Sequence, residues 1–236
     1  MEYSDKKGEN MKALCFVNML SLKNKALCES LRDSVNISCL EDKAFKARFY
    51  KCEIESASFV LALLCKLYKP LEFEALDEGY LSAESCFGED EALEVLDFLK
   101  DCEVLIFDEG LKKHKDYENI KYFLNFLSKE FGLELLDSKG VKCEFKDVIL
   151  KELKELDNYD GLVLFNAPLK DKLLHASRQF LLVAKCQNEA LVELEGKNLK
   201  IETKIVLDEN LQGTIAFLNY ENTNEDFVKI RLKELQ

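Results

Sequence analysis

The feature that most constrains this chain is a regular alternation of helical and strand patterns that begins near residue 88. An amphipathic pattern over 88–100 precedes the apolar run EVLIFD (103–108), and a second helical pattern follows Asp116, which we expect to cap it, and ends at Gly132. A further helix is expected over 146–156, and buried strands are expected at LELL (133–136), GLVLFNAP (161–168) and RQFLLVAK (178–185). Alternation of this length predicts an α/β fold, with a parallel sheet flanked by helices in a Rossmann-like three-layer arrangement.

The two ends of the chain have a different character. Strands are expected over 11–18 and 43–51, with a buried helix over 55–68, and the polar first ten residues are expected to be frayed. Alternating apolar residues predict β structure in LKIETKIVL (199–207), GTIAFLN (213–219) and FVKIRL (227–232). We therefore expect an N-terminal segment with a short strand and irregular structure at 1–42, an α/β domain at 43–190, and a C-terminal β-rich portion packed on it at 191–236.

Charge limits the classes of partner. The net charge is −12, and residues 53–110 alone hold three Lys/Arg against sixteen Asp/Glu. An acidic surface repels phosphate backbones, so nucleic acid is excluded as a partner. The acidic region is either a solvated face or a docking face for a basic partner. The apolar run 57–65 has only nine residues, whereas a membrane span needs about twenty. We expect a soluble cytoplasmic protein that reaches a membrane only through a partner.

The cysteines argue against a metal centre. The chain has nine, and no two lie closer than eleven residues, so no C-x-x-C pair occurs. Iron–sulfur and structural zinc sites usually need at least one close pair. The odd count fits free, mostly buried thiols in a reducing compartment. No iron–sulfur cluster and no molybdenum is expected.

Candidate binding residues follow the expected strands. Asp108, Glu109 and Gly110 come after EVLIFD, and Asn166 comes after GLVLF. At the carboxyl ends of strands in a doubly wound sheet, such residues line the ligand crevice, although the same residue types also form ordinary turns. No G-x-G-x-x-G or G-x-x-x-x-G-K motif occurs, so phosphates are not bound in either familiar way.

No catalytic residue is assigned. His175 lies near Ser177, but no G-x-S-x-G elbow accompanies them, which favours a structural histidine. His114 lies in the polar stretch LKKHKD and is expected in an exposed loop.

Five stretches, taken in order, resemble a known family. They are YLSAESCFGEDEALEVL (80–96), CEVLIFDEGLKKHKDYENIKYFL (102–124), YDGLVLFNAP (159–168), FLLVAKCQNEALVELEGKNLKI (180–201) and LQGTIAFLNY (211–220). Together they resemble the carboxyl-terminal, molybdopterin-oxidoreductase-like half of the large peripheral-arm subunit of bacterial NADH–quinone oxidoreductase, respiratory complex I. In that family a Gly-bearing loop follows a strand, and Asp108, Glu109 and Gly110 stand at this place. The family's cluster-binding cysteines have no counterpart here.

The resemblance implies a shortened, freestanding relative, suited to replace the NADH-binding subunits. The first hypothesis is an accessory or electron-input subunit of the complex I peripheral arm, without iron–sulfur clusters of its own. It would contact other peripheral-arm subunits or a small electron-carrier protein at the inner face of the cytoplasmic membrane. The second is an electron-transfer protein serving that complex and holding a flavin, FMN or FAD, at Asp108–Gly110 and Asn166. The third is a small-molecule-binding or interaction domain unrelated to respiration.

Overall fold

The chain forms two compact units. The computed structural model describes residues 11–220 and 225–235, and it divides the chain into residues 1–156 and 157–236. The expected frayed segment 1–10 lies outside the described residues. The division differs from the expected boundaries at 42/43 and 190/191. The strands before residue 42 pair in one sheet with strands that follow it, so they belong to the first unit. Residues 163–184, which were expected in the α/β domain, belong to the second unit instead.

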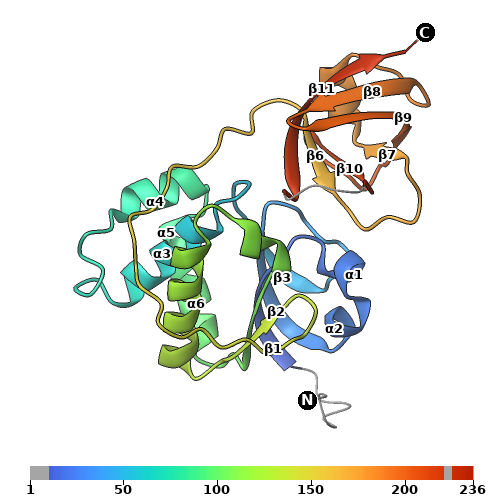
Figure 1. Cartoon of the computed structure of the whole chain (residues 1–236). Helices are drawn as coiled ribbons and strands as arrows, with labels where there is room; N and C mark the ends of the chain where they lie inside the picture. The colour runs from blue at the N-terminus through green and yellow to red at the C-terminus, as the bar shows by residue number, and fades with distance from the viewer. Residues whose placement is uncertain (1–10, 221–224, 236) are drawn as a thin grey trace. The chain divides into compact units, whose positions relative to one another are not determined.

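The first unit is built on a five-stranded parallel sheet, which confirms an α/β fold with a helix-flanked parallel sheet (Figure 1). The strand order is β3-β2-β1-β4-β5. All four neighbouring pairs are parallel. The strands are β1 (Met11–Phe16), β2 (Leu31–Ser38), β3 (Ala47–Lys51), β4 (Val104–Phe107) and β5 (Glu134–Asp137).

Helices cover both faces of this sheet, giving three layers. On one face lie α3 (Ala57–Tyr68), α4 (Glu78–Ser85), α5 (Glu89–Leu99) and α6 (Tyr117–Phe131). On the other lie the short helices α1 (Leu20–Lys23) and α2 (Lys25–Glu29). All four side chains of β4 are buried. Leu105 and Phe107 pack toward α3 and α6, whereas Val104 and Ile106 pack toward α1 and α2.

The apolar periodicity of α6 explains its position. Ile120, Phe123, Leu124 and Leu127 recur at helical spacing and are fully buried. The helix ends at Gly132, whose φ of +68° is the left-handed conformation that glycine adopts without a steric penalty. Asp116 precedes the helix as expected, but its carboxylate makes no capping hydrogen bond.

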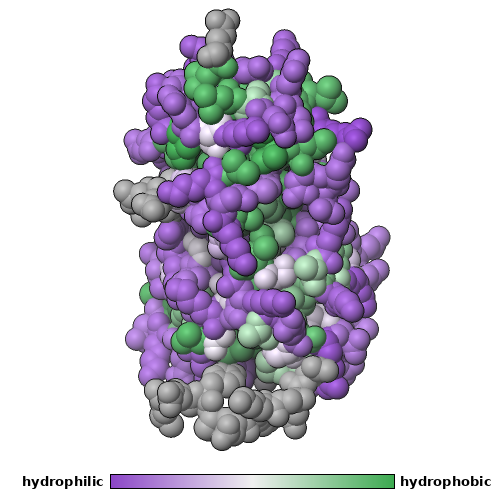
Figure 2. Space-filling view, turned by 90° about the vertical axis from the view of Figure 1, so that its right-hand side faces the viewer, coloured by the Kyte–Doolittle hydropathy of each residue, from purple (hydrophilic) through white to green (hydrophobic). Residues whose placement is uncertain are grey.

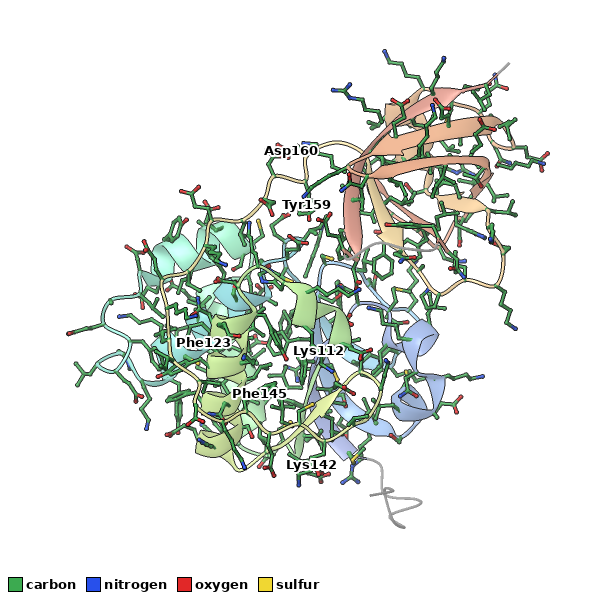
Figure 3. The ribbon with its side chains drawn as sticks, viewed as in Figure 1. Lys112, Phe123, Lys142, Phe145, Tyr159 and Asp160 are labelled. Carbon is green, nitrogen blue, oxygen red and sulfur yellow. The ribbon has the colours of Figure 1, made fainter. Side chains whose placement is uncertain are left out.

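The expected helix over 146–156 is absent. Residues 143–156, which we call the connector, run without regular structure from the end of the first unit's sheet to the boundary with the second. Phe145, which is labelled in Figure 3, packs on the rings of Phe107 and Tyr117, with centroids 5.8 and 6.3 Å away. The backbone N–H groups of Lys151 and Lys154 donate to the side chains of Asn119 on α6 and of Asp116, which directly precedes α6. Tertiary contacts therefore determine the conformation of the connector, in spite of its helix propensity.

The second unit is a closed barrel with strand order β10-β6-β11-β8-β9-β7. Its elements are β6 (Val163–Asn166), β7 (Leu174–Ala176), α7 (Arg178–Ala184), β8 (Leu191–Gly196), β9 (Leu199–Leu207), β10 (Ile215–Leu218) and β11 (Phe227–Glu234). The expected β structure at 199–207, 213–219 and 227–232 is confirmed. The expected strand at 161–168 forms, but it pairs with β10 and β11 rather than with the first unit's sheet.

The expected strand at 178–185 is wrong, because these residues form α7. The Ser177 side chain accepts the backbone N–H of Phe180 and caps the helix, and Lys185 ends it at a φ of +55°. Short apolar runs are ambiguous between strand and helix, and here the cap decides the outcome. Among the described helices, none is long and apolar enough to cross a membrane.

Candidate functional site

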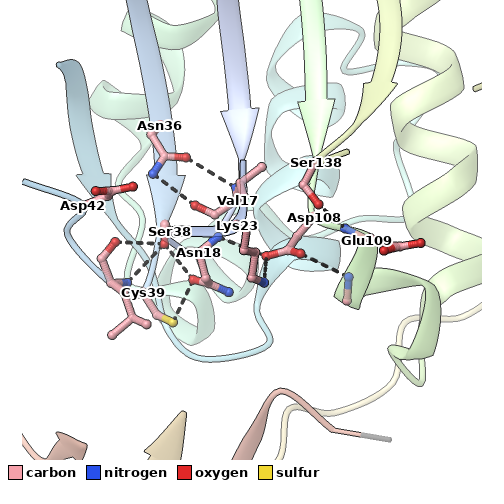
Figure 4. Close-up of polar contacts among 12 residues, drawn as sticks. Val17, Asn18, Lys23, Asn36, Ser38, Cys39, Asp42, Asp108, Glu109 and Ser138 are labelled. Atoms are coloured by element: carbon pink, nitrogen blue, oxygen red, sulfur yellow. Dashed lines mark hydrogen bonds and ion pairs between the residues drawn. The ribbon is translucent and has the colours of Figure 1, made fainter. Parts of the chain in front are cut away.

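The candidate site lies where the winding of the sheet reverses. The chain proceeds outward from β1 to β2 and β3, then returns to place β4 on the other side of β1. Ligands of open α/β sheets bind at such a switch point, outside the carboxyl ends of the strands. Here the strand ends are followed by Val17 and Asn18 after β1 and by Asp108 after β4 (Figure 4).

Asp108 joins the two sides of the switch point. Its side chain is 4% exposed, and one carboxylate oxygen, Oδ2, accepts the Asn18 backbone N–H at 3.1 Å and the Lys23 Nζ at 2.7 Å. The other oxygen, Oδ1, accepts the Gly110 N–H at 3.1 Å. Both oxygens of Asp108 are thus bonded within the chain, and the Lys23 ammonium compensates the buried charge.

The loop after β1 is fixed to β2 by side chains. Asn36 bonds both backbone groups of Val17, accepting its N–H at 3.4 Å and donating to its carbonyl at 3.2 Å. Ser38 Oγ donates to Asn18 Oδ1 at 2.7 Å. The residue after Asn18, Met19, has a φ of +55°, a conformation uncommon for a non-glycine residue. These bonds hold the loop after β1 in a defined shape.

The loop after β4 is tied to the loop after β5. Ser138 Oγ accepts the Glu109 N–H at 3.0 Å, and Lys139 Nζ lies 2.6 Å from Glu109 Oε2. The Lys139 hydrogen bond is the main reason why the pKa of Glu109 lies below its ordinary value. Lys112 Nζ lies 3.1 Å from Asp137 Oδ2 and 3.6 Å from Glu109 Oε1. Partial burial opposes the charge of Lys112, but the Asp137 and Glu109 carboxylates raise its pKa overall.

The Cys39 thiol at the switch point is not set up as a nucleophile. Cys39 Sγ lies 3.3 Å from Asn18 Oδ1. Burial raises the pKa of the Cys39 thiol well above its ordinary value, and the nearby Cys52, Glu53 and Asp108 act in the same direction. A protonated thiol is a poor nucleophile and a poor metal ligand.

The structure brings three of the four predicted site residues together and leaves out the fourth. Asp108, Glu109 and Gly110 lie at the switch point, as expected. Asn166 follows β6 in the barrel, where its N–H donates to the Asp226 carbonyl at 2.9 Å and its Oδ1 accepts the Tyr220 N–H at 3.4 Å. The expectation that Asn166 lines the crevice of the same sheet is wrong, because its strand pairs in the barrel.

Neither histidine forms part of a nucleophilic arrangement. His114 Nδ1 accepts the Asp116 N–H at 3.0 Å, which leaves Nε2 to donate to the Glu55 carbonyl at 2.8 Å. His114 is therefore a partly buried loop anchor rather than an exposed residue. His175 Nε2 lies 3.0 Å from Asp171 Oδ1, whereas the Ser177 hydroxyl donates to the Gly213 carbonyl at 2.6 Å.

All nine cysteines are free. Burial raises the pKa of Cys28 to about 11 and that of Cys52 to about 12. Within residues 11–220 and 225–235, no cluster of three or more His, Cys, Asp or Glu side chains could hold a metal ion.

The sequence reasoning missed the partners of Asp108. Lys23 lies 85 positions away along the chain, on a four-residue helix too short to be recognised by periodicity. Asn18 was the better signal, because an Asn at the end of an expected strand is in the same position as Asp108.

Compared with known protein families and with curated proteins, the sequence matches no family model and no curated protein.

Proposed function

We propose that this chain is a non-catalytic accessory subunit at the electron-input end of a bacterial NADH–quinone oxidoreductase, holding no iron–sulfur cluster of its own. The resemblance to that enzyme's large peripheral-arm subunit supports this role, and it extends over both units. The stretches at 80–96 and 102–124 belong to the first unit, and those at 159–168, 180–201 and 211–220 belong to the second. The Lys23–Asp108 bond carries the non-catalytic part of the proposal. The carboxylate best placed for chemistry is neutralised by the chain's own cation.

A surface of acidic side chains on α5 favours a basic protein partner. This acidic surface consists of four exposed residues on one side of the helix, Glu89, Asp90, Glu94 and Asp97. Leu93, among them, is 52% exposed. Complementary charge increases the rate and selectivity of association more than its strength, whereas an apolar side chain contributes buried area. The partners that fit are other peripheral-arm subunits or a small electron-carrier protein, through which the chain would reach the inner face of the cytoplasmic membrane.

Exposed apolar side chains also occur on the barrel. Leu182 and Val183, adjacent on α7, are 78% and 50% exposed. Figure 2 shows hydrophobic side chains gathered among hydrophilic ones over one face of the barrel. Clusters of this kind are more typical of protein contacts than of an isolated chain.

Co-purification tests the proposal. A tagged copy of the chain in its native cells is expected to retain the peripheral arm of the oxidoreductase. Reversing two charges of the acidic surface, Glu89→Lys with Asp90→Lys, is expected to lower the recovered arm about tenfold, with the largest loss at low salt. Glu41→Lys with Glu202→Lys makes the same change in net charge at exposed sites outside this surface and is expected to have no effect. Isolation of the tagged chain without the arm, together with unaltered quinone reduction in a deletion strain, would contradict the proposal.

A flavin-binding role is the second candidate, favoured by the position of Asp108–Gly110 at the switch point. In that case Lys23 would have to leave Asp108 when the flavin binds. The protein purified from its native cells would then be yellow and release FMN or FAD on denaturation. A colourless preparation that takes up neither compound excludes this role and leaves the subunit proposal intact.

A further inference from the structure

The connector is held in a conformation that its own sequence does not favour. Eight of the eleven residues in KDVILKELKEL (146–156) are Lys, Glu or Leu, which are strong helix formers. In the structure this segment has no helix, and Asp147 lies in the left-handed region at a φ of +54°. Conflict between local preference and the folded conformation is expected at functional elements rather than at inert ones.

The pattern of burial identifies the folded conformation. Leu150, Leu153 and Leu156 pack against the core of the first unit, and the two residues between each pair are exposed. A three-residue period is that of an extended, polyproline-like chain. Ile149 is left 70% exposed. In a helix, Ile149 would share one face with Leu153 and Leu156, because these residues are four and seven positions apart.

Two buried polar side chains, Asn119 on α6 and Asp116 directly before it, hold the connector. Asn119 Oδ1 accepts the Lys151 N–H at 2.7 Å, and Asn119 Nδ2 donates to the Glu152 carbonyl at 3.2 Å. Asp116 Oδ2 accepts the Lys154 N–H at 3.2 Å. Asp116 is 3% exposed and Asn119 is 1% exposed, and Asn119 Nδ2 donates to Asp116 Oδ1 at 2.9 Å. Asp116 thus binds the connector instead of capping its own helix.

The bound state and a helical state exclude each other. In a helix, the N–H of Lys151 would donate to the carbonyl of residue 147, and that of Lys154 to the carbonyl of residue 150. These are the same two donors that Asn119 and Asp116 occupy. We propose that the connector is a conformational switch, which exchanges an extended state bound to α6 for a released amphipathic helix. The inference is independent of the proposed subunit role.

Nuclear magnetic resonance of the full chain tests the switch. Asn119→Leu removes two of the hydrogen bonds to the connector while keeping an apolar side chain in the buried position. We expect hydrogen exchange at Lys151 and Lys154 to become about tenfold faster, as the loss of a hydrogen bond predicts. The ¹³Cα shifts of residues 148–156 should move from the extended to the helical side. Ser128→Ala is the matched control, since it removes a bond from Ser128 Oγ to the Leu133 carbonyl at the other end of α6.

A proline separates switching from simple release. Glu152 is exposed, and proline at 152 suits an extended backbone but blocks a helix. Glu152→Pro alone should leave the wild-type shifts unchanged, whereas combined with Asn119→Leu it should abolish the helical shifts. If hydrogen exchange in β4 also becomes faster in Asn119→Leu, this substitution damages the fold itself. The same measurements are then made on Asp116→Ser instead. Connector shifts that stay extended, or that become those of a random coil, would overturn the proposal.

Discussion

Lys23 and Asp108 form an ion pair of 2.7 Å across the point where the winding of the parallel sheet reverses. One residue comes from a four-residue helix after β1 and the other from the end of β4. The pair occupies the place where related architectures hold a ligand. A change at the candidate site that breaks this ion pair should therefore also lower the stability of the sheet.

Removing the cation of this pair should destabilise the first unit. Lys23→Met leaves the buried Asp108 carboxylate without its ammonium, and we expect a loss of about 2 kcal/mol in the free energy of unfolding. Lys25→Met, in an exposed pair with Glu29, should cost under about 0.5 kcal/mol. Urea denaturation measures both changes. The double variant Lys23→Met with Asp108→Asn should lose less than the two single changes added together; additive losses would show that the two side chains are not coupled.

The pair between Glu109 and Lys139 should give a small acid dependence to stability. The lysine hydrogen bond lowers the pKa of Glu109 in the folded state, so its contribution is present above the unfolded value of about 4.3 and is lost as the pH falls through the folded value. Because the Glu109 side chain is 37% exposed, screening limits the effect to a few tenths of a kcal/mol. Lys139→Ala should be less stable than wild type at pH 7, and this difference should shrink as the pH falls through the folded-state pKa of Glu109. Lys43→Ala, at an exposed position, should show no such convergence; a difference for Lys139→Ala that does not shrink in acid would point to another cause.

The parallel sheet was predictable because its signals are local. The run VLIF has no charge and is bounded by polar residues, which identifies β4 and therefore places Asp108 at a strand end. The apolar face of α6 and Gly132 at its end identify the helix that follows. These features depend on side chains within a few positions of one another, and hence they can be read from the sequence.

The failures concern segments whose conformation depends on distant partners. Residues 146–156 have a helical pattern, but Asn119 and Asp116, more than thirty positions earlier, bind their backbone. One signal was present: Asn119 is a polar residue beside Ile120 and Phe123, and a buried amide needs a partner. Asn166 was misplaced because strand pairing in the barrel joins β6 to β10 and β11, which no local pattern reveals.

Gly196 should be intolerant of a larger residue. It lies at the end of β8, where an added Cβ would be 2.8 Å from Val228 Cγ1 and 3.1 Å from the Lys229 carbonyl oxygen on β11. Gly196→Ala must push these strands apart, and we expect a loss of about 1–3 kcal/mol in the barrel. Hydrogen exchange should be faster at Val192 and unchanged at Leu105 of the first unit.

Gly79→Ala is the matched control for this substitution. Gly79 lies in α4, where an added Cβ would meet only Asp77 Oδ1, at 3.5 Å, an ordinary contact. Alanine favours a helix over glycine, so this variant should be more stable by about 0.5–1 kcal/mol. A neutral Gly196→Ala would mean that the contact between β8 and β11 is looser than described.

Alkylation should distinguish the nine thiols by burial. Cys15 and Cys65 are fully buried, and burial raises the pKa of both well above the ordinary value. Iodoacetamide at pH 8 should therefore leave them unmodified until the protein is unfolded in urea, where all nine should react. Cys86 is exposed and should react first in the folded protein.

Cys86 should nevertheless react more slowly than a thiol in a short peptide. Partial burial and a hydrogen bond with Glu53 raise its pKa, which lowers the thiolate fraction at pH 8. Glu53→Gln removes the carboxylate charge and should make the alkylation of Cys86 faster. Mass spectrometry of the tryptic peptides measures the rate of alkylation at each cysteine. Early modification of Cys15 or Cys65 would mean that the sheet or α3 opens in the native state, because no static path leads a reagent to either sulfur.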